Sequence, residues 1–308
     1  MKNATAVLVV CVIALVGLSV GAEGQTLVGW GYNGYGQTNV PSGTFQAIAA
    51  GTGHSLGLRT DGTLVGWGDN RSGQTNMSGT FKAIAAGYDQ SFAIRPDGTL
   101  VGWGWGSNNG GQTNVPSGTF TAVAAGCVHT LAIRTDRTLV GWGYNYYGET
   151  NVPSGIFTAI AAGMFHSLAI RRDGTLVGWG YNEHGETNVP SGTFTAIAAG
   201  EYHSLALRTD GTLLGWGYNG YGQTNVPSGT FTAIAAGTVH SLGLRTDGTL
   251  VGWGDNAHGQ TNVPGGTYVA VAAGGSHSLA MTPIPEPSSF LALGAGLLGL
   301  AGFTRRRR

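Results

Sequence analysis

Short apolar runs alternate with turn residues along most of the chain. In residues 43–68, runs of five or six mostly apolar residues occupy 45–50, 54–59 and 63–67, and Gly, Asp or Thr bounds each run. This length and bounding predict three short β-strands. Thr60-Asp61-Gly62 separates the second run from the third and predicts a tight hairpin, because glycine adopts the left-handed backbone conformation.

Both faces of these predicted strands carry apolar or small residues. With the two-residue period of a strand, His54, Leu56 and Leu58 share one face, and Ser55 and Gly57 share the other. A strand that is buried on both faces needs one sheet packed against another. Radial blades around an axis provide that arrangement.

The same unit recurs, and its clearest mark is a Gly-Trp-Gly segment found seven times. The tryptophans are 37, 36, 39, 37, 37 and 37 residues apart. A period between 20 and 50 residues predicts a solenoid, propeller or array. The flanking glycines let neighbouring backbones approach while the indole fills the gap between blades. We therefore expect structural roles for Trp30, Trp67, Trp103, Trp142, Trp179, Trp216 and Trp253.

The two ends of the array complement each other. The last repeat, residues 268–281, has the first two runs but lacks a Gly-Trp-Gly run, whereas residues 26–31 form an unpaired one. Pairing this first run into the last blade leaves no open seam. The sequence thus predicts an all-β, seven-bladed β-propeller over residues 26–281, with three short strands per blade.

The segments outside the array look like targeting signals. Residues 1–22 combine a basic start, an apolar run and a small-residue site ending at Ala22, which predicts a secretory signal peptide. Residues 282–308 contain Pro285-Glu286-Pro287, an apolar segment over 290–303 and four terminal arginines. Fourteen apolar residues are short for a transmembrane helix, which needs about 20, so we expect a transient membrane association. A simple C-terminal membrane anchor is the alternative.

Composition narrows the classes of function. The chain has 56 glycines, 42% hydrophobic residues and 10% charged residues, which fits neither collagen nor a disordered protein. Without the tails, ten basic and fourteen acidic residues give a body near −4. A mildly acidic body offers no stripe for phosphates, so no nucleic acid is expected. Cys127 is the single cysteine outside the leader, and we interpret it as a bystander.

Repeated polar residues raise catalytic and metal-binding hypotheses that the pattern itself weakens. A histidine recurs at the start of six middle runs, but Gln90 takes its place in the second repeat. Glutamine replaces a hydrogen-bonding histidine but is a poor ligand for zinc or copper. We therefore expect blade-interface hydrogen bonds and no metal or cofactor at His54, His129, His166, His203, His240 and His277.

The remaining polar residues do not indicate an enzyme. The repeated aspartates lie in predicted turns, where all but Asp136 precede glycine, and Arg137 should strain its turn slightly. The repeated serines directly follow a histidine, or Gln90 in one repeat, so the two side chains point to opposite faces of a strand. No unique polar cluster breaks the sevenfold pattern. We predict no catalytic residue, although a propeller lyase remains an alternative.

Variable positions are the better candidates for function. They follow the Ala-Ala-Gly segment or lie in the loop after each tryptophan, where aromatic side chains sit beside glycine-rich turns. Such residues are typical of protein-binding hot spots and also suit stacking on sugar rings, although they could merely cover blade edges. The candidate binding residues are Tyr35, Arg71, Tyr88, Trp105, Tyr146, Tyr147, Phe165, His184, Tyr202, Tyr221 and His258.

The unit resembles the regulator-of-chromosome-condensation repeat: Ala-Ala-Gly-x-x-His-Ser-Leu-Ala-Leu, then Asp-Gly-Thr-Leu, then Gly-Trp-Gly-x-Asn-x-x-Gly-Gln-Thr. The match recurs through residues 26–281, and the short period is most similar to the bacterial version in β-lactamase inhibitor protein II, notably over Trp253–Pro264. This resemblance implies three-stranded blades and a binding surface of variable loop residues at one end.

The tail resembles the PEP-CTERM sorting signal of Gram-negative bacteria that make exopolysaccharide, with Pro285, Glu286 and Pro287 as its core. The resemblance implies processing by an exosortase and a cell-surface or extracellular location, after an inner-membrane stage. Together these features predict an exported, non-enzymatic propeller that binds an extracellular protein or polysaccharide. The alternative is a structural envelope or matrix protein with no specific ligand.

Overall fold

The structure is a computed structural model that describes residues 25–105 and 110–283. The predicted signal peptide and the Pro285-Glu286-Pro287 motif lie outside these residues. Within the described ranges, no helix has the length and apolar character needed to cross a membrane.

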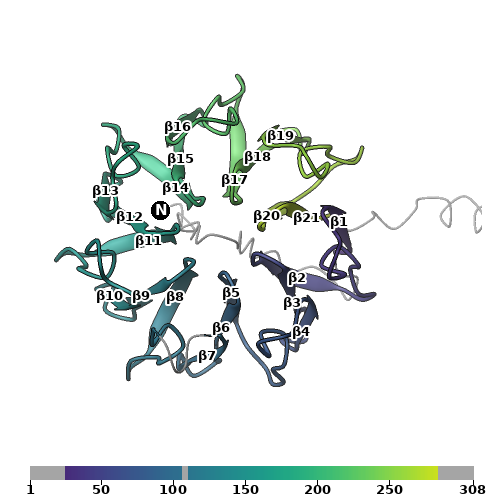
Figure 1. Ribbon diagram of the computed structural model, residues 1–308, viewed down its shortest axis with the longest axis horizontal. Coiled ribbons are helices and arrows are strands. Elements are labelled where there is room, and N and C mark those ends of the chain that lie inside the picture. Colours follow the sequence, from purple (N-terminus) through teal and green to yellow (C-terminus); the bar gives the residue numbers. More distant parts are fainter. Residues whose placement is uncertain (1–24, 106–109, 284–308) are drawn as a thin grey trace, which may run out of the picture.

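Seven three-stranded antiparallel sheets surround a central axis, and this confirms the predicted seven-bladed propeller (Figure 1). The strands nearest the axis are β2, β5, β8, β11, β14, β17 and β20. The strands are β1 (Leu27–Gly31), β2 (Phe45–Ala50), β3 (His54–Arg59), β4 (Leu64–Gly68), β5 (Ala83–Ala86), β6 (Gln90–Ile94), β7 (Leu100–Gly104), β8 (Phe120–Ala125), β9 (His129–Arg134), β10 (Leu139–Gly143), β11 (Phe157–Ala162), β12 (His166–Arg171), β13 (Leu176–Gly180), β14 (Phe194–Ala199), β15 (His203–Arg208), β16 (Leu213–Gly217), β17 (Phe231–Ala236), β18 (His240–Arg245), β19 (Leu250–Gly254), β20 (Ala270–Ala273) and β21 (His277–Met281).

The ring closes through the first strand, as the sequence predicts. β1 pairs antiparallel with β21, from Leu27 opposite Met281 to Gly31 opposite His277. Beyond the strands, the Thr282 amide donates to the Thr26 carbonyl at 3.0 Å. The seventh blade is therefore hydrogen-bonded like the others, and the ring has no unpaired seam.

Glycines tighten the ring around the axis. The glycine after each inner strand packs against the carbonyl of its equivalent in the next blade. A Cβ at Gly163 would lie 2.6 Å from the Gly200 carbonyl oxygen, and one at Gly51 would lie 2.5 Å from that of Gly87. These distances exclude any side chain without a backbone shift. The ring comprises Gly51, Gly87, Gly126, Gly163, Gly200, Gly237 and Gly274.

The repeated tryptophans join neighbouring blades. Each indole Nε1–H donates to a main-chain carbonyl in the loop of the adjacent blade, for example Trp67 to Gln37 at 2.8 Å and Trp179 to Glu149 at 2.7 Å. The glycine before each tryptophan lies against the loop that follows its own strand, as Gly66 does against Thr75. The indoles thus fill the space between blades and satisfy their only polar group.

Histidines and serines form a second set of links between blades, which we call the histidine girdle. The Nε2 atom of His54 lies 2.8 Å from Ser91 Oγ, and His277 closes the circle onto Ser55 at 2.9 Å. The Ser91 hydroxyl itself donates to the Gln74 carbonyl, so its oxygen accepts the imidazole Nε2–H. The six histidines are His54, His129, His166, His203, His240 and His277.

The single break in the girdle is compensated locally. Gln90 stands at the histidine position of the second blade and donates to the Gly126 and Cys127 carbonyls instead. The next blade carries Thr130 where the others carry serine. Glutamine thus preserves a bond between blades without an imidazole.

The hairpins between middle and outer strands follow from their sequence. Asp61 Oδ1 accepts from the Thr63 amide and hydroxyl, and Gly62 has φ +83°. Arg137, at the equivalent of Gly62, has φ +70°, the one positive φ outside glycine among residues 25–105 and 110–283. The β9–β10 hairpin still forms with its full register, so the strain is local.

Candidate functional site

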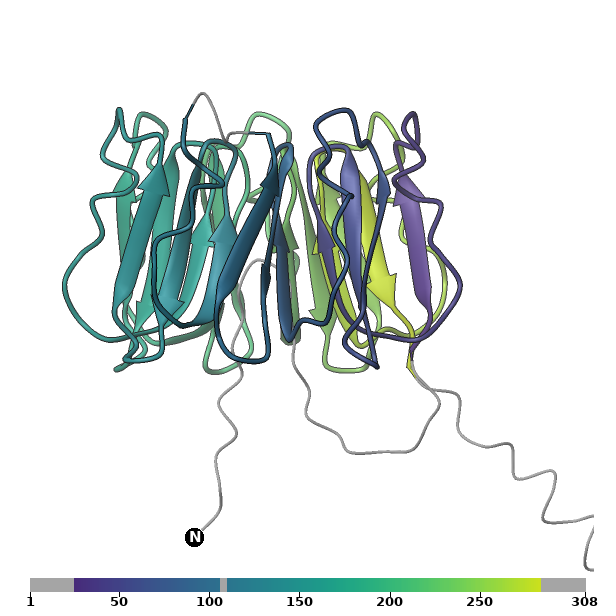
Figure 2. The ribbon, with the colours of Figure 1, turned by 90° about the horizontal axis from the view of Figure 1, so that it is seen from below.

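The two ends of the propeller are built from different segments. At one end, which we call the loop face, the turn from inner to middle strand meets the segment after the outer strand. The Tyr181 amide donates to the Phe165 carbonyl at 2.9 Å, and Tyr218 donates to Tyr202 at 2.8 Å. The opposite end, the hairpin face, carries the Asp-Gly turns. Figure 2 shows the loop face at the top, where the β1 arrow ends. Both sets of variable positions therefore lie on one face.

Aromatic rings form a continuous row over three neighbouring blades of the loop face. Ring centroids are 4.9 Å apart for Tyr146 and Tyr147, 5.0 Å for Tyr147 and Tyr181, and 5.1 Å for His184 and Tyr218. We call this row the aromatic arc. It comprises Tyr144, Tyr146, Tyr147, Phe165, Tyr181, His184, Tyr202, Tyr218 and Tyr221.

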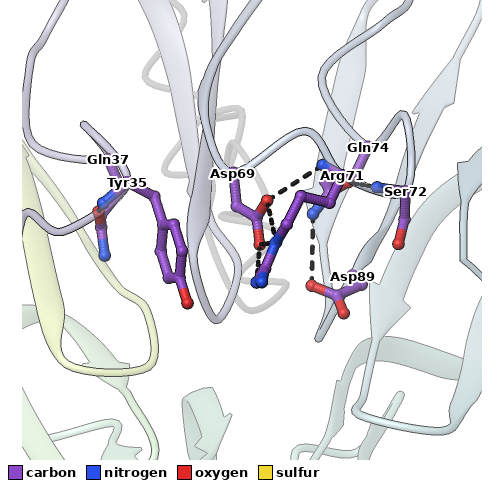
Figure 3. Close-up of polar contacts among 7 residues, drawn as sticks. All are labelled: Tyr35, Gln37, Asp69, Arg71, Ser72, Gln74 and Asp89. Carbon is purple, nitrogen blue, oxygen red and sulfur yellow. Dashed lines mark hydrogen bonds and ion pairs between the residues drawn. The ribbon is translucent and has the colours of Figure 1, made fainter.

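A second cluster lies elsewhere on the loop face. The Tyr32 ring is 5.0 Å from that of His258, and the Arg71 guanidinium lies 4.7 Å from the Tyr35 ring. Arg71 also pairs with the buried Asp69 carboxylate at 2.7 Å (Figure 3). The guanidinium hydrogen bonds of Arg71 hold the pKa of Asp69 below its usual range. The single arginine of the loop face is thus already engaged.

The structure distributes the eleven sequence-predicted binding residues over this face. Six belong to the aromatic arc: Tyr146, Tyr147, Phe165, His184, Tyr202 and Tyr221. Three belong to the second cluster: Tyr35, Arg71 and His258. Tyr88 and Trp105 are exposed on the loop face, and neither ring contacts another aromatic ring among the described residues.

Of the residues that directly follow Gly-Trp-Gly, sequence reasoning selected only Trp105 and missed the equivalents in the other repeats. Tyr144, Tyr181 and Tyr218 occupy this position and connect the predicted residues into one arc. The signal was present, because the same position holds Asp69 and Asp255 in other repeats. The position therefore varies between blades, although it lies within a stretch that otherwise reads as turn residues.

A buried polar side chain supports each of these loops, and sequence reasoning missed it as well. In six of the seven loops the side-chain oxygen accepts from the amide two residues earlier, as Gln37 does from Tyr35 at 2.9 Å and Glu149 does from Tyr147 at 2.9 Å. In the seventh loop, Gln112 Oε1 is buried with no partner among the described residues. Five blades use glutamine and two use glutamate. The residues are Gln37, Gln74, Gln112, Glu149, Glu186, Gln223 and Gln260.

The axis opens on the loop face into a small depression of about 70 Å³. The glycine ring lines it, together with Tyr88, Cys127 and Glu201. Burial, together with the Glu201 carboxylate, raises the pKa of Cys127 to about 12. Its thiol is therefore protonated at neutral pH and is a poor nucleophile. In the described part of the chain, no group of three or more His, Cys, Asp or Glu residues is placed to hold a metal ion.

Charge divides sharply between the two faces. The loop face carries seven carboxylates, including Glu183 and Glu201, against one arginine, a formal charge of −6. The hairpin face carries the six turn aspartates against nine basic residues, a formal charge of +3. The propeller, whose total charge is small, therefore has an acidic loop face and a basic hairpin face.

Comparisons with known proteins agree with this architecture. The regulator of chromosome condensation (RCC1) repeat matches residues 45–74, 120–149, 157–186, 194–223 and 231–260. The PEP-CTERM protein-sorting motif matches residues 283–308. No curated protein matches the chain.

Solved structures with the same fold include Prp20p from Saccharomyces cerevisiae and human WBSCR16. The yeast protein has a TM-score of 0.75 at 17% identity, covering 91% of this chain and 96% of its own. The human protein has a TM-score of 0.69 at 18% identity, covering 84% and 98%. At this identity the likeness shows the fold alone. The chain is therefore a seven-bladed propeller that contains five RCC1 repeats, and it carries a PEP-CTERM protein-sorting motif.

Proposed function

We propose that the protein is an exported, non-enzymatic binding propeller whose loop face recognises an extracellular protein. The observation that carries this proposal is the aromatic arc, in which nine rings lie side by side across three blades. Tyr146 is 76% exposed and Tyr221 is 55% exposed. Exposed tyrosines give large contact areas at a small entropic cost, which is typical of binding hot spots.

The sorting motif supports a location outside the cytoplasm. A PEP-CTERM motif indicates a Gram-negative bacterium and processing by an exosortase. After a transient stage at the inner membrane, the propeller is then released or attached at the cell surface or in the extracellular matrix.

The path of the chain supports the orientation that this function needs. β1 begins and β21 ends at the hairpin face, where the hydroxyls of Thr26 and Thr282 lie 2.8 Å apart. A C-terminal attachment therefore extends from the hairpin face. The loop face, with its aromatic arc, then points away from the point of attachment.

The side chains that suggest chemistry are used by the fold, and this favours binding over catalysis. The histidines of the girdle are buried and bonded to serines of the next blade. The turn aspartates bond to threonines within the same hairpin, as Asp61 does to Thr63. A polysaccharide ligand, a purely structural role and a lyase are the competing functions.

A pull-down from matrix and secreted fractions with residues 23–282 tests the proposal. A triple substitution of Trp105, Tyr146 and Tyr147 by serine should abolish capture of a saturable protein ligand and leave the fold intact. Ile156→Ser is the matched control, because Ile156 is an exposed apolar residue on the hairpin face. If neither pull-downs nor glycan arrays yield a saturable ligand, the structural role is favoured.

A further inference from the structure

Two buried carboxylates stand out beneath the aromatic arc. Glu149 and Glu186 occupy the position that five other blades fill with glutamine. Both residue types accept the same amide hydrogen bond, since His184 donates to Glu186 Oε2 at 3.0 Å as Tyr221 donates to Gln223 at 2.9 Å. The loop conformation therefore requires a side-chain oxygen that accepts this hydrogen bond, but it does not require a negative charge. The charge appears only in the two loops that carry most of the arc.

The second oxygen of each glutamate is buried and has no hydrogen-bond partner among the described residues. Glu149 and Glu186 are 0% exposed, and in each the unpartnered atom is Oε1. Burial raises the pKa of Glu149. An uncompensated buried carboxylate is costly, whereas a glutamine at the same site avoids that cost.

Equivalent blades show where this free oxygen points. Gln74 Nε2 reaches Asp89, the residue before the girdle position of the next blade (Figure 3), and Gln260 Nε2 reaches Asp255, the residue after Gly-Trp-Gly. In the repeats that contain the two glutamates, these positions hold aromatic residues. They are Tyr144 and Phe165 for Glu149, and Tyr181 and Tyr202 for Glu186. The free oxygens therefore face the underside of the arc.

The surroundings of the arc favour a cation. Glu183 and Glu201 add two more carboxylates, and the three loops over 144–154, 181–191 and 218–228 contain no lysine or arginine. Arg71 lies in the second cluster and is paired with Asp69. The faces of tyrosine rings attract cations. Aromatic faces, buried carboxylates and a formal charge of −6 on the loop face complement a positive charge.

From this geometry we infer that the aromatic arc binds a basic protein segment, with a lysine ammonium or arginine guanidinium seated between the tyrosine rings above Glu149 and Glu186. This inference rests on the proposed function and names the chemistry of the partner. The bound cation compensates the two buried carboxylates, and the rings supply apolar contact around it.

The test uses residues 23–282, because all 21 strands and the closing pair lie within this range. Acetylated hexalysine, hexaarginine and hexaglutamate peptides are titrated by calorimetry at low and physiological salt. We expect saturable binding of the two basic peptides that weakens with salt, and none of hexaglutamate. Absence of binding by both basic peptides overturns the inference.

The decisive variants are Glu149→Gln and Glu186→Gln, which restore the residue of the other blades. The double variant should unfold at the same or a higher temperature and bind the basic peptides about tenfold more weakly or worse. Each single variant should lose less affinity for the basic peptides than the double variant. The single variants replace the double variant in the test if the double variant does not fold. Asp255→Asn, at a loop-face carboxylate outside the aromatic arc, is the control and should change affinity much less.

The outcomes separate this inference from the proposed function. If Tyr147→Ser and Tyr181→Ser abolish capture of a ligand from the matrix fraction but the glutamine variants bind as the wild type does, the loop face stands and the cation site is wrong. If the tyrosine variants also have no effect, the proposed function fails. Capture of chitosan oligosaccharides in place of basic peptides overturns the assignment to a protein.

Discussion

Acidification should unfold this propeller through its histidine girdle. Each imidazole uses its Nε2–H to bond a serine, and Nδ1 of His54, His203 and the other four is buried with no partner among the described residues. A second proton would go onto Nδ1, which has no acceptor there. Burial accordingly lowers the pKa to about 4 for His54 and to about 3 for His203.

These lowered pKa values set the direction and the magnitude of the pH dependence of the free energy of unfolding. An unfolded histidine titrates near 6.5, so between about pH 6.5 and pH 4 the unfolded chain binds more protons than the folded one. The contribution of the histidines to the free energy of unfolding is therefore fully present above about pH 6.5 and is lost as the pH falls toward 4. Each histidine contributes about 1.4 kcal/mol per pH unit, and six histidines have lowered pKa values. Burial raises the pKa of Asp89, Glu149 and Glu201, which opposes this trend with only three groups.

A loss of several kcal/mol per pH unit is large against a typical total stability of about 5–15 kcal/mol. Denaturant unfolding of residues 23–282 between pH 7.5 and pH 4.5 measures it. His203→Gln, which copies the natural glutamine at Gln90, should reduce the pH slope by about 1.4 kcal/mol per unit. His258→Gln, at an exposed position, is the control. A stability that stays flat down to pH 4.5 refutes the reasoning.

Three further substitutions test the packing. Gly163→Ala should lower the free energy of unfolding, measured by denaturant titration, by about 1–3 kcal/mol or more, because the new Cβ would meet the carbonyl of the neighbouring Gly200. Gly265→Ala is the control and should leave the free energy of unfolding unchanged, because no atom lies near its added Cβ. Arg137→Gly should raise stability by about 1 kcal/mol in thermal unfolding, because its φ is +70°; no gain would remove the strain argument. Ser204→Ala leaves the buried His166 Nε2–H without its acceptor and should cost about 1–3 kcal/mol, with a loss below 0.5 kcal/mol contradicting the girdle.

The fold could be predicted almost completely because its determinants are local and repeated. The position of Trp30 at the start and the missing tryptophan run after Met281 were enough to predict the closure of the ring. The identity of the partners across blades could not be predicted. Nothing in the order His-Ser shows that His54 bonds Ser91, 37 residues away, because that contact depends on how neighbouring blades are placed.

The candidate site was only partly predictable. The sequence separates variable from repeated positions, so Tyr146, Tyr147 and Tyr202 could be selected as candidates. It does not show that Tyr181 connects them, or that Glu149 lies beneath them. Those facts depend on loops of different blades meeting on one face. The special likeness to β-lactamase inhibitor protein II and the binding roles themselves stay predictions.

The central claim is that recognition occurs on the loop face. Amide hydrogen exchange of residues 23–282, alone and with the protein retained in the pull-down, measures this most directly. We predict protection in residues 144–149, 164–165, 181–186, 201–202 and 218–223, with no change in the hairpin turns such as 60–62. Protection confined to the hairpin turns, or to the outer strands, would contradict the account.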